Sequence, residues 1–465
     1  MVKIRYFYNL IKLTQYNGEI MTKSTKLDFK EYRLLVFLII GLGYLLVFFH
    51  RVAPAVVALD MMSDLKAGAV LIGFLASGYF YPYAIMQLPT GILSDSWGPR
   101  KTITFFFLIA AVGSVILGLS IDISSAILGR VLVGLGASTL YVCALKILSQ
   151  WYKGEEFATM TGFLIAIGGV GLLVSTIPLA LLSNAVGWRM PFILTGVITL
   201  MLALLVWVFV RNSPEDLGMP AVVTNNISKD PNIPLLGMPA VVKNSPQNKK
   251  KVPLLKSVIK VLSLKYYWPV SIWMFCTMAI YLAFGGLWGG PYLIQIYGMT
   301  KVEASRVLSM IAVGMIIGSP LMGILSDRII KRRKIVVNVS SVLLLIIMAF
   351  LYFSISSIST MGLYLICFGL GIFSVGVIAI GYALIKDLFP IEIAGTSTGI
   401  ANFFPFLMGA LYQPLMGYIL ELNGKLGDSY TATGYQNAFL VLFISSIIAC
   451  IASFFIKENS SKPLR

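Results

Sequence analysis

Two adjacent ionisable residues end a long apolar run near the start of the chain, and their types could bind an anion or carry a proton. Sixteen apolar residues, 34–49, lead directly into His50 and Arg51. At 1.5 Å per helical residue, Arg51 lies about 27 Å from Arg33, past the middle of a bilayer but still inside it. Charged residues at that depth usually face a bundle interior or a water-filled cavity. We therefore predict that Arg51 binds an anionic solute; snorkelling to the outer interface is the alternative.

Two further residues could assist Arg51. His50 is the chain's only histidine and could carry a proton near neutral pH, although a hydrogen-bonded structural role is as common. Arg130, inside the apolar segment 125–148, is expected at a depth in the membrane similar to that of Arg51, so the two guanidiniums could share one anionic group. Gly134 and Gly136 follow it and permit close helix contact.

Tyrosines and an amide supply more polar groups at helical spacing. Tyr79, Tyr83 and Gln87 are four residues apart and would share one helix face. Tyr281 and Trp288 flank paired glycines in a segment that can bend, and they could wall a solute. Packing at the membrane interface is the alternative for these aromatics.

The elements that position these residues are membrane helices. With 58% hydrophobic and 12% charged residues and a mean hydropathy of +0.88, the chain has the bilayer as its solvent. A span takes about 20 apolar residues, and turn and charge clusters divide the chain into twelve such segments. Their approximate bounds are 33–58, 69–94, 102–121, 125–148, 157–183, 189–210, 266–294, 303–326, 335–356, 361–387, 394–420 and 436–456. The sequence predicts an all-α membrane protein with twelve transmembrane helices.

A repeated pentapeptide divides these helices into two halves. Gly-Ile-Leu-Ser-Asp occurs at 91–95 and at 323–327, in a chain of 465 residues. Recurrence at half the chain length, each time where an apolar span meets a basic loop, indicates two copies of one membrane unit. We predict two pseudo-symmetric six-helix bundles, 33–210 and 265–457. The linker 211–264 joins them, and the tails are 1–32 and 458–465.

Charge sets the expected orientation. The net charge is +17, but Lys and Arg lie in alternate loops rather than on one aromatic-studded face, so nucleic acid is not an expected partner. The positive-inside rule makes both tails and the linker cytoplasmic. The first thirty residues lack a cleavable signal pattern, and Met21 is an alternative start to Met1.

The loops at the repeat resemble a family motif. The first resembles the loop between helices 2 and 3 of the major facilitator superfamily; the second is similar but lacks the second glycine. The residues are Gly91, Asp95, Gly98, Arg100 and Lys101 in the first loop, and Gly323, Asp327, Arg328 and Arg332 in the second. The resemblance implies that Asp95 docks near the start of helix 11 and Asp327 near the start of helix 5, as latches that close the cytoplasmic side, with arginine balancing the carboxylate.

Other segments extend this resemblance. Arg130 with its glycines resembles the family's helix 4 motif, and in the family helix 1 lines the central cavity. Residues 79–91, 187–192 and 286–292 resemble a bacterial branch related to lysosomal dipeptide carriers and to phagosomal amino-acid and nucleoside carriers.

The resemblance implies a secondary transporter that works by alternating access. The expected solute is small and organic with a carboxylate or phosphate, short peptides or amino acids first and organic anions such as sugar phosphates second. A drug/proton antiporter or a transport-inactive sensor is less favoured. Proton symporters of the superfamily commonly use a buried carboxylate, and no Asp or Glu falls in the middle of any span here. This favours uniport, exchange or coupling through His50, with protons as a second expected partner.

Several classes are excluded. The sequence has no nucleophile–base pair, phosphate-cradling loop or metal-ligand spacing, so we expect neither an enzyme nor a metal or cofactor. The four cysteines each lie alone in an apolar stretch: Cys143, Cys276, Cys367 and Cys450. We expect a monomer in the bacterial inner membrane.

Overall fold

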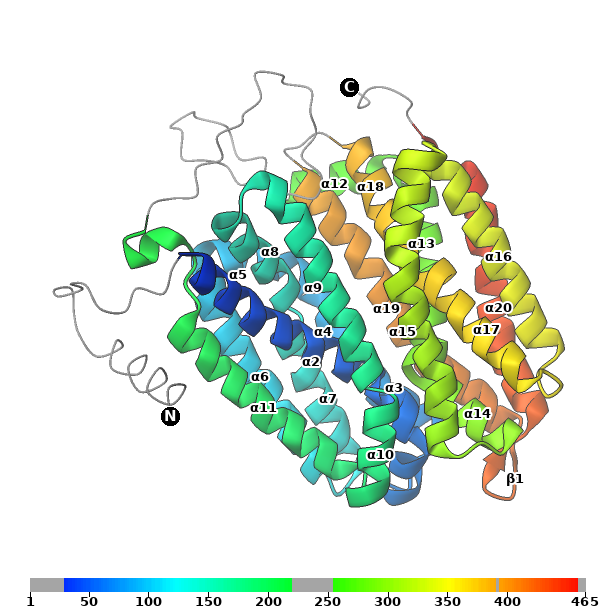
Figure 1. Cartoon of the computed structure of the whole chain (residues 1–465). Coiled ribbons are helices and arrows are strands. Elements are labelled where there is room, and N and C mark those ends of the chain that lie inside the picture. Colours follow the sequence, from blue (N-terminus) through cyan, green and yellow to red (C-terminus); the bar gives the residue numbers. More distant parts are fainter. Residues whose placement is uncertain (1–28, 220–253, 390–392, 459–465) are drawn as a thin grey trace.

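The computed structural model describes residues 29–219, 254–389 and 393–458. Most of the predicted tails and the central part of the predicted linker lie outside these residues. Ten helices come first along the chain: α2 (Phe29–Asp64), α3 (Ala69–Ser77), α4 (Phe80–Ile85), α5 (Gln87–Ser96), α6 (Pro99–Leu119), α7 (Ile123–Ala137), α8 (Leu140–Trp151), α9 (Gly154–Val174), α10 (Ile177–Val186) and α11 (Arg189–Phe209). They form the first bundle, drawn in blue to green in Figure 1.

The second bundle follows the linker and is drawn in yellow-green to red. Between the bundles lie the 3₁₀-helix η1 (Pro214–Leu217) and α12 (Leu254–Ser263). The second bundle consists of α13 (Tyr267–Ala283), η2 (Phe284–Trp288), α14 (Gly289–Tyr297), α15 (Lys301–Ile324), η3 (Leu325–Ile329), α16 (Arg333–Phe353), α17 (Thr360–Leu370), η4 (Gly371–Gly376), α18 (Ile378–Leu388), α19 (Ala394–Leu422) and α20 (Ala432–Phe455). η2, η3 and η4 are π-helical.

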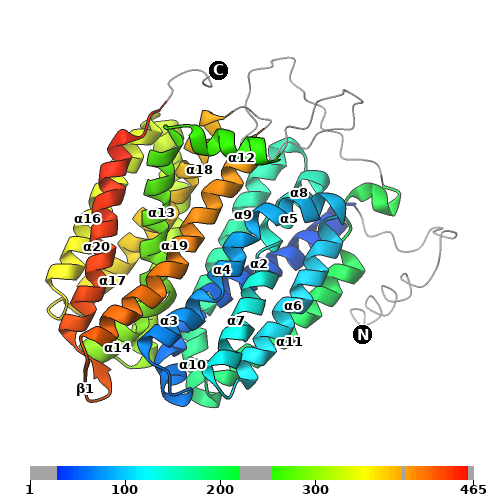
Figure 2. The same cartoon turned by 180° about the vertical axis from the view of Figure 1, so that it is seen from behind.

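The number of spans agrees with the sequence. Within the described residues, eleven helices are long and apolar enough to cross a membrane, and the bent pair Ala69–Ile85 and Pro89–Ser96 makes twelve if it is one span. That pair is bent by 58°. The fold is therefore the predicted all-α membrane fold, with the two bundles side by side in Figures 1 and 2.

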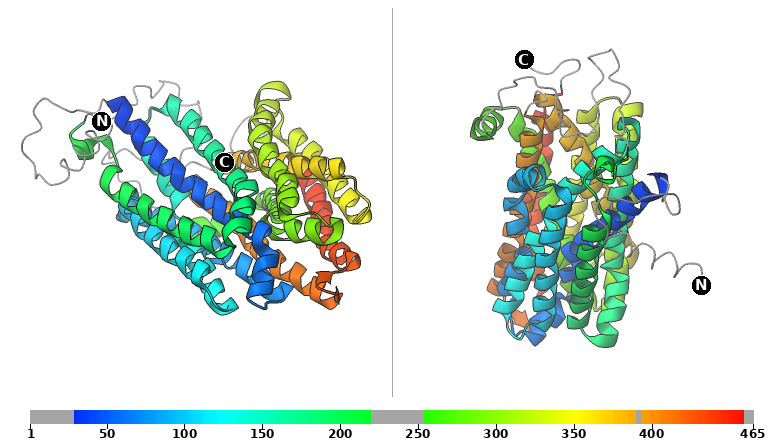
Figure 3. Two further views of the ribbon diagram at one scale, coloured as in Figure 1. Left: turned by 60° about the horizontal axis from the view of Figure 1, so that its bottom comes forward. Right: turned by 90° about the vertical axis from the view of Figure 1, so that its left-hand side faces the viewer.

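The two ends of the molecule differ, and we name them for their neighbours. The linker end carries α12 and α18, at the top of Figure 1. The hairpin end carries the antiparallel strands β1 (Lys425–Leu426) and β2 (Ser429–Tyr430) between α19 and α20. Figure 3 shows the bundles from the hairpin side and edge-on.

Several spans are interrupted where glycine or proline weakens the helical hydrogen-bond ladder. α3 gives way to α4 at Gly78, and α9 gives way to α10 at Thr176, two residues before Pro178. The glycine-rich segment predicted to bend is the π-helix η2, which continues into α14 at Gly289. π-helical turns inside membrane helices frequently occur at functional sites.

One helix start shows how loop residues set these bounds. Asp122 caps α7, because its Oδ1 accepts hydrogen bonds from the backbone N–H groups of Ser124 at 2.8 Å and Ser125 at 3.0 Å. These bonds, from Ser125 first, lower the pKa of Asp122 below its ordinary value. The cap fixes the start of the helix that carries Arg130.

Candidate functional site

Arg51 lies where the two bundles meet, enclosed by aromatic rings. Its guanidinium carbon is 4.4 Å from the ring centroid of Phe48, 4.9 Å from that of Phe406 and 5.3 Å from that of Tyr83. Phe48 and Tyr83 belong to the first bundle, whereas Phe406 lies on α19 of the second. Arg51 is 4% exposed. Cation–π contacts of a desolvated guanidinium contribute up to about 2 kcal/mol, so rings from both bundles fix this cation. We call these three rings the aromatic enclosure.

No described carboxylate neutralises Arg51. None of the ion pairs in the described part of the chain includes it, and its Nε has no hydrogen-bond partner there. Two tyrosines of the first bundle lie beside this cation: the Tyr83 ring faces it, and the Tyr79 ring stacks on that of Tyr83. A buried cation without a counter-ion is costly, so this position suits an anion that arrives and leaves.

The predicted polar stripe on helix 2 is continuous across the helix breaks. The rings of Tyr79 and Tyr83 stack with centroids 5.6 Å apart, and the Gln87 Nε2 donates to the Tyr83 carbonyl at 3.0 Å. The Gln87 Oε1 in turn accepts a 2.6 Å bond from the amide of Asn402 on α19. The Asn402 Oδ1 accepts a further 2.6 Å bond from Tyr382 on α18. The stripe therefore ends in a hydrogen-bonded bridge to the second bundle.

Arg130 is bound to the backbone rather than free to share the position of Arg51. Its Nη1 donates to the His50 carbonyl at 2.8 Å and its Nη2 to the Ala76 carbonyl at 3.3 Å. Pro54 has no N–H to offer the carbonyl four residues earlier, which is that of His50, and Ala76 lies in the last turn of α3. Arg130 is 0% exposed. In this conformation it satisfies carbonyls that two other helices leave open, and no described contact tests whether the two guanidiniums share one anion.

His50 packs within the first bundle. Its ring centroid lies 5.6 Å from that of Phe49 and 6.4 Å from that of Phe192 on α11. Neither ring nitrogen has a hydrogen-bond partner among the described residues. These contacts are apolar and separate from the aromatic enclosure, so they favour the structural alternative for His50, and they do not test its proton-carrying role.

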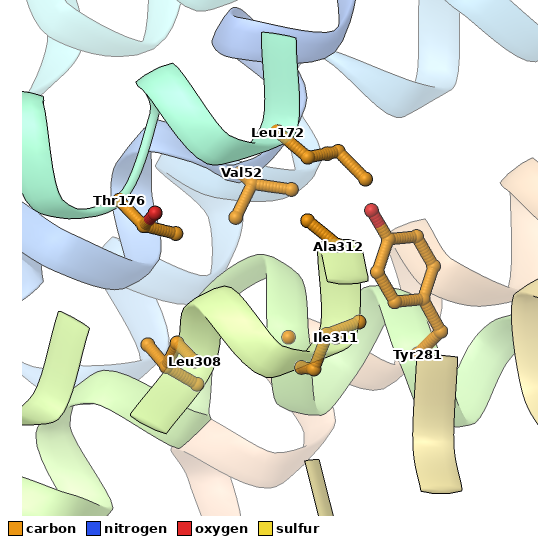
Figure 4. Close-up of a pocket in the computed structure, with 8 residues that line it drawn as sticks. Val52, Leu172, Thr176, Tyr281, Leu308, Ile311 and Ala312 are labelled. Atoms are coloured by element: carbon orange, nitrogen blue, oxygen red, sulfur yellow. The ribbon is translucent and has the colours of Figure 1, made fainter. Parts of the chain in front are cut away.

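Tyr281 lines a small cavity between the bundles. The cavity has a volume of about 10 Å³ and also touches Val52, Leu172, Thr176 and Leu308. Figure 4 shows the Tyr281 hydroxyl directed toward Leu172, and this hydroxyl has no hydrogen-bond partner in the described part of the chain. A volume of this size holds roughly one water, so little free space lies beside the Tyr281 hydroxyl.

Trp288 belongs to the packing of the second bundle. It is 0% exposed, and its Nε1 donates to the Gln413 carbonyl at 2.9 Å. The side-chain amide of Gln413 donates back to the Leu282 carbonyl at 2.9 Å, beside the π-helix η2. These bonds tie the bent helix to α19. In this conformation Trp288 therefore packs between helices, which is the alternative to a solute-binding role.

The first motif loop makes its described contacts inside its own bundle. The Asp95 carboxylate pairs with Lys146 on α8 at 2.7 Å. The Arg100 side chain donates to the Trp207 carbonyl on α11, whereas Lys101 is exposed. The cation that balances Asp95 is therefore Lys146, not the arginine of the motif. Docking of Asp95 near the start of the family's helix 11, which corresponds to α19 here, stays a prediction.

A glycine shapes this loop. Gly98 has a φ of +84°, a region that favours glycine. A Cβ there would lie 2.8 Å from the Asn212 amide nitrogen, and the Asn212 Oδ1 accepts a 2.9 Å bond from the backbone N–H of Arg100. Gly98 thus allows the turn of the loop and leaves room for Asn212, which follows α11 and binds the loop backbone at Arg100.

The second motif loop is also closed within its own bundle. Asp327 pairs with Arg333 at 3.2 Å, and Arg333 reaches Asp387 on α18 at 2.5 Å. Arg328 and Arg332 are exposed. The partner is therefore Arg333, adjacent to the predicted Arg332, and the docking of Asp327 at helix 5 stays a prediction.

Gly134 and Gly136 lie at close helix approaches. A Cβ on Gly134 would be 2.1 Å from the Tyr79 carbonyl oxygen, and one on Gly136 would be 2.3 Å from the Phe106 carbonyl oxygen. In contrast, a Cβ on Gly91 or Gly323 would meet nothing within 4 Å. The space beside Gly134 and Gly136 on α7 is thus occupied by neighbouring helices, whereas the space beside Gly91 and Gly323 is open.

Sequence reasoning missed the residues that complete the site from the second bundle. Phe406 and Asn402 are four residues apart on α19, which places them on one helix face. Their only sequence signal is that polar Asn402 interrupts an apolar helix. Phe48, three residues before Arg51, was hidden inside the apolar run.

Comparison with known proteins gives the family. The model of the Major Facilitator Superfamily matches residues 36–412 and 274–465. The probable hexose phosphate transport protein of Chlamydia trachomatis serovar D is 23% identical over 440 residues, covering 92% of this chain and 91% of the relative. The probable galactarate/D-glucarate transporter GudP of Bacillus subtilis strain 168 is 25% identical over 442 residues, covering 92% and 94%.

Solved structures agree on the fold. A bacterial homologue of the human lysosomal transporter Spinster, in an inward-facing and unoccupied conformation, superposes with a TM-score of 0.70 at 19% identity, covering 92% of this chain and 96% of that one. The nucleoside transporter NupG superposes with a TM-score of 0.68 at 14% identity, covering 92% and 100%. The chain belongs to the Major Facilitator Superfamily and is a multi-pass membrane transporter.

Proposed function

We propose that this protein carries a small hydroxylated organic anion across the membrane, bound at Arg51 between the two bundles. The observation that carries the proposal is the buried guanidinium that has no described carboxylate beside it and is enclosed by rings from both bundles. An anionic group at this point would neutralise the cation and contact both halves of the carrier. That position suits a solute that moves as the bundles rock.

The hydroxyls around Arg51 support a polyhydroxylated cargo. The Tyr83 ring faces the guanidinium and the Tyr79 ring stacks on that of Tyr83, and the Tyr281 hydroxyl, which lines the small cavity between the bundles, has no described partner. Tyrosine hydroxyls both donate and accept hydrogen bonds, so they can replace water around sugar hydroxyls. Because Arg130 is bound to backbone carbonyls, Arg51 is the cation that we assign to the anionic group of the cargo.

The relatives favour the second of the two expected solute classes. The matched proteins are named for hexose phosphate and for galactarate and glucarate transport, which are organic anions with hydroxyl groups. A preference for short peptides or amino acids finds no support in them. We therefore rank sugar phosphates and sugar acids above peptides as the cargo.

The expected orientation carries over to the proposal. The linker end, with its basic segments, faces the cytoplasm by the positive-inside rule, and the hairpin end faces outward. We propose an inner-membrane location and a monomer, since each chain contains both bundles and a complete aromatic enclosure.

A binding screen tests the cargo class. Purified protein is heated with each of four probe groups: hexose phosphates, aldarates, dipeptides and nucleosides. A bound ligand raises the melting temperature by mass action. We expect hexose phosphates or aldarates to raise it and the uncharged parent hexoses not to. A shift with dipeptides or nucleosides alone would contradict the proposed cargo.

A further inference from the structure

The hairpin end of the bundle interface has polar contacts that join the two bundles directly. The Glu421 Oε1, at the end of α19, accepts a 2.9 Å hydrogen bond from the backbone N–H of Val70. The Tyr430 hydroxyl, on β2, accepts a 3.1 Å bond from the backbone N–H of Ala69. Ala69 and Val70 are the first two residues of α3. Two side chains of the second bundle therefore bind the start of a helix of the first.

These contacts act as a helix cap supplied by the other bundle. The first N–H groups of a helix have no intrahelical acceptor, and the helix dipole favours a negative charge there. Gly68, the N-cap position of α3, makes no side-chain cap of its own. A Cβ at Gly68 would lie 2.2 Å from the Glu421 Oε1. The glycine thus leaves the space that the carboxylate fills.

A second polar contact crosses the same end. Lys301, the first residue of α15, pairs with Asp60 near the end of α2 at 2.6 Å. Its Nζ also donates to the Ser183 hydroxyl on α10 at 3.1 Å. The Lys301 side chain is 17% exposed. The ion pair and the hydrogen bond together join the start of α15 to α2 and α10 of the first bundle.

Glycines bring the helices beneath these contacts close together. A Cβ on Gly73 of α3 would lie 2.5 Å from the Cα of Pro414. One on Gly417 of α19 would lie 2.4 Å from the Ala69 carbonyl oxygen, and one on Gly290 of α14 would lie 1.7 Å from the Ala55 carbonyl oxygen. Figure 2 shows α19 beside α3 and α4 at the centre of the molecule. No methyl group fits between the bundles at these points.

A tyrosine bonds to a carbonyl that proline frees at the same interface. Pro414 has no N–H for the carbonyl four residues earlier, that of Ala410. The Tyr81 hydroxyl of the first bundle donates to this carbonyl at 3.2 Å. The interface is therefore bonded as well as closely packed.

We propose that Glu421, supported by Tyr430, is the gating residue of a seal at the hairpin end. The carboxylate caps α3 in the closed state and must leave that helix start whenever the bundles part on this side. The family resemblance predicts that Asp95 and Asp327, at the linker end, each dock on a helix start of the other bundle. The described carboxylate that does so in this conformation is Glu421, at the hairpin end. The inference goes beyond the proposed function, because the seal acts on any cargo.

Cysteine labelling from the hairpin side of the membrane tests the seal. Thr176 lines the small cavity between the bundles and is 3% exposed. The reporter is Thr176→Cys in a chain whose four native cysteines are replaced by alanine, with an impermeant maleimide added in oriented vesicles. Loss of a helix cap is worth about fivefold in an equilibrium, so we expect Glu421→Ala to raise the labelling rate about fivefold.

Three companion variants separate gating from misfolding. Gly68→Ala displaces the carboxylate without removing it, and Tyr430→Phe removes the second acceptor; both are expected to raise labelling. Asp122→Ala is the matched control, because Asp122 caps its own helix α7 and is expected to leave labelling unchanged. Unchanged labelling in Glu421→Ala and Gly68→Ala, with normal melting temperatures, would overturn the proposal, as would an equal rise in Asp122→Ala.

Discussion

The guanidinium carbon of Arg51 lies 4.9 Å from the ring centroid of Phe406, and the two residues belong to different bundles. This buried cation is thus held by both halves of the transporter. Any movement of one bundle relative to the other changes this contact. The site and the conformational change are therefore linked through one pair of side chains.

Phe406→Leu should weaken cargo binding while leaving the protein folded. A leucine keeps the apolar contact but removes the ring face, and a cation–π contact is worth about 1 kcal/mol or more. We expect the KM for transport to rise about fivefold. The measurement is uptake into proteoliposomes at varied substrate. Phe403→Leu is the control, since the Phe403 ring lies edge-on to its neighbour Phe404 and is not among the rings that face Arg51; an equal effect there would contradict the role of the enclosure.

Arg130→Lys should reduce stability more than binding. A lysine cannot reproduce the forked donation to the carbonyls of His50 and Ala76. Hydrogen bonds from a charged group contribute about 1.5–3 kcal/mol each, so the melting temperature should fall clearly. Ligand affinity of the folded fraction should stay within about twofold by the same reasoning. Normal stability with lost binding would instead assign Arg130 to the cargo.

His50→Gln should leave coupling unchanged. The His50 ring contacts Phe49 and Phe192, and its nitrogens have no described acceptor, so a charged imidazolium would be buried without a partner. Cargo uptake and any cargo-driven pH change in the lumen should persist in the variant. The pH change is followed with a trapped dye. Its loss, with uptake down a gradient retained, would identify His50 as the proton carrier.

Breaking the bridge between Gln87 and Asn402 should favour opening at the linker end. This 2.6 Å bond joins α5 to α19. Gln87→Leu and Asn402→Ala should each raise the labelling rate of Tyr141→Cys from the linker side in a chain free of native cysteines. Because both variants break one bond, the double variant should add little. Additive effects would show that the two side chains act separately.

The sequence predicted the fold because membrane helices depend on local apolar length, which the chain displays directly. Arg51 was found for the same reason, since an arginine after sixteen apolar residues is visible without a fold. The backbone contacts of Arg130 have one cause that is in the sequence, because Pro54 frees the carbonyl of His50 four residues earlier. Which side chain donates to that carbonyl depends on how α7 packs against α2, and no local sequence pattern predicts this packing.

The contacts between the two bundles could not be predicted from the sequence. Phe406 meets Arg51, and Glu421 meets Val70, across more than 300 residues of chain. The apolar pattern of α19 marks it as a span but leaves its rotation open. The ion-pair partners of the motif loops show the same limit, because only the packing of the helices places Lys146 and Arg333 beside Asp95 and Asp327.

Counterflow in proteoliposomes tests the central claim most directly. Vesicles loaded with unlabelled hexose phosphate or aldarate, whichever binds, are diluted into the labelled compound, with wild type, Arg51→Lys and Arg51→Gln compared at equal protein content and equal melting behaviour. The account predicts rapid exchange by the wild type, a loss of at least about 100-fold in Arg51→Gln as for an unpaired buried charge, and little rescue by Arg51→Lys, because an ammonium cannot stack as a planar guanidinium does. Exchange by Arg51→Gln at the wild-type rate would contradict it.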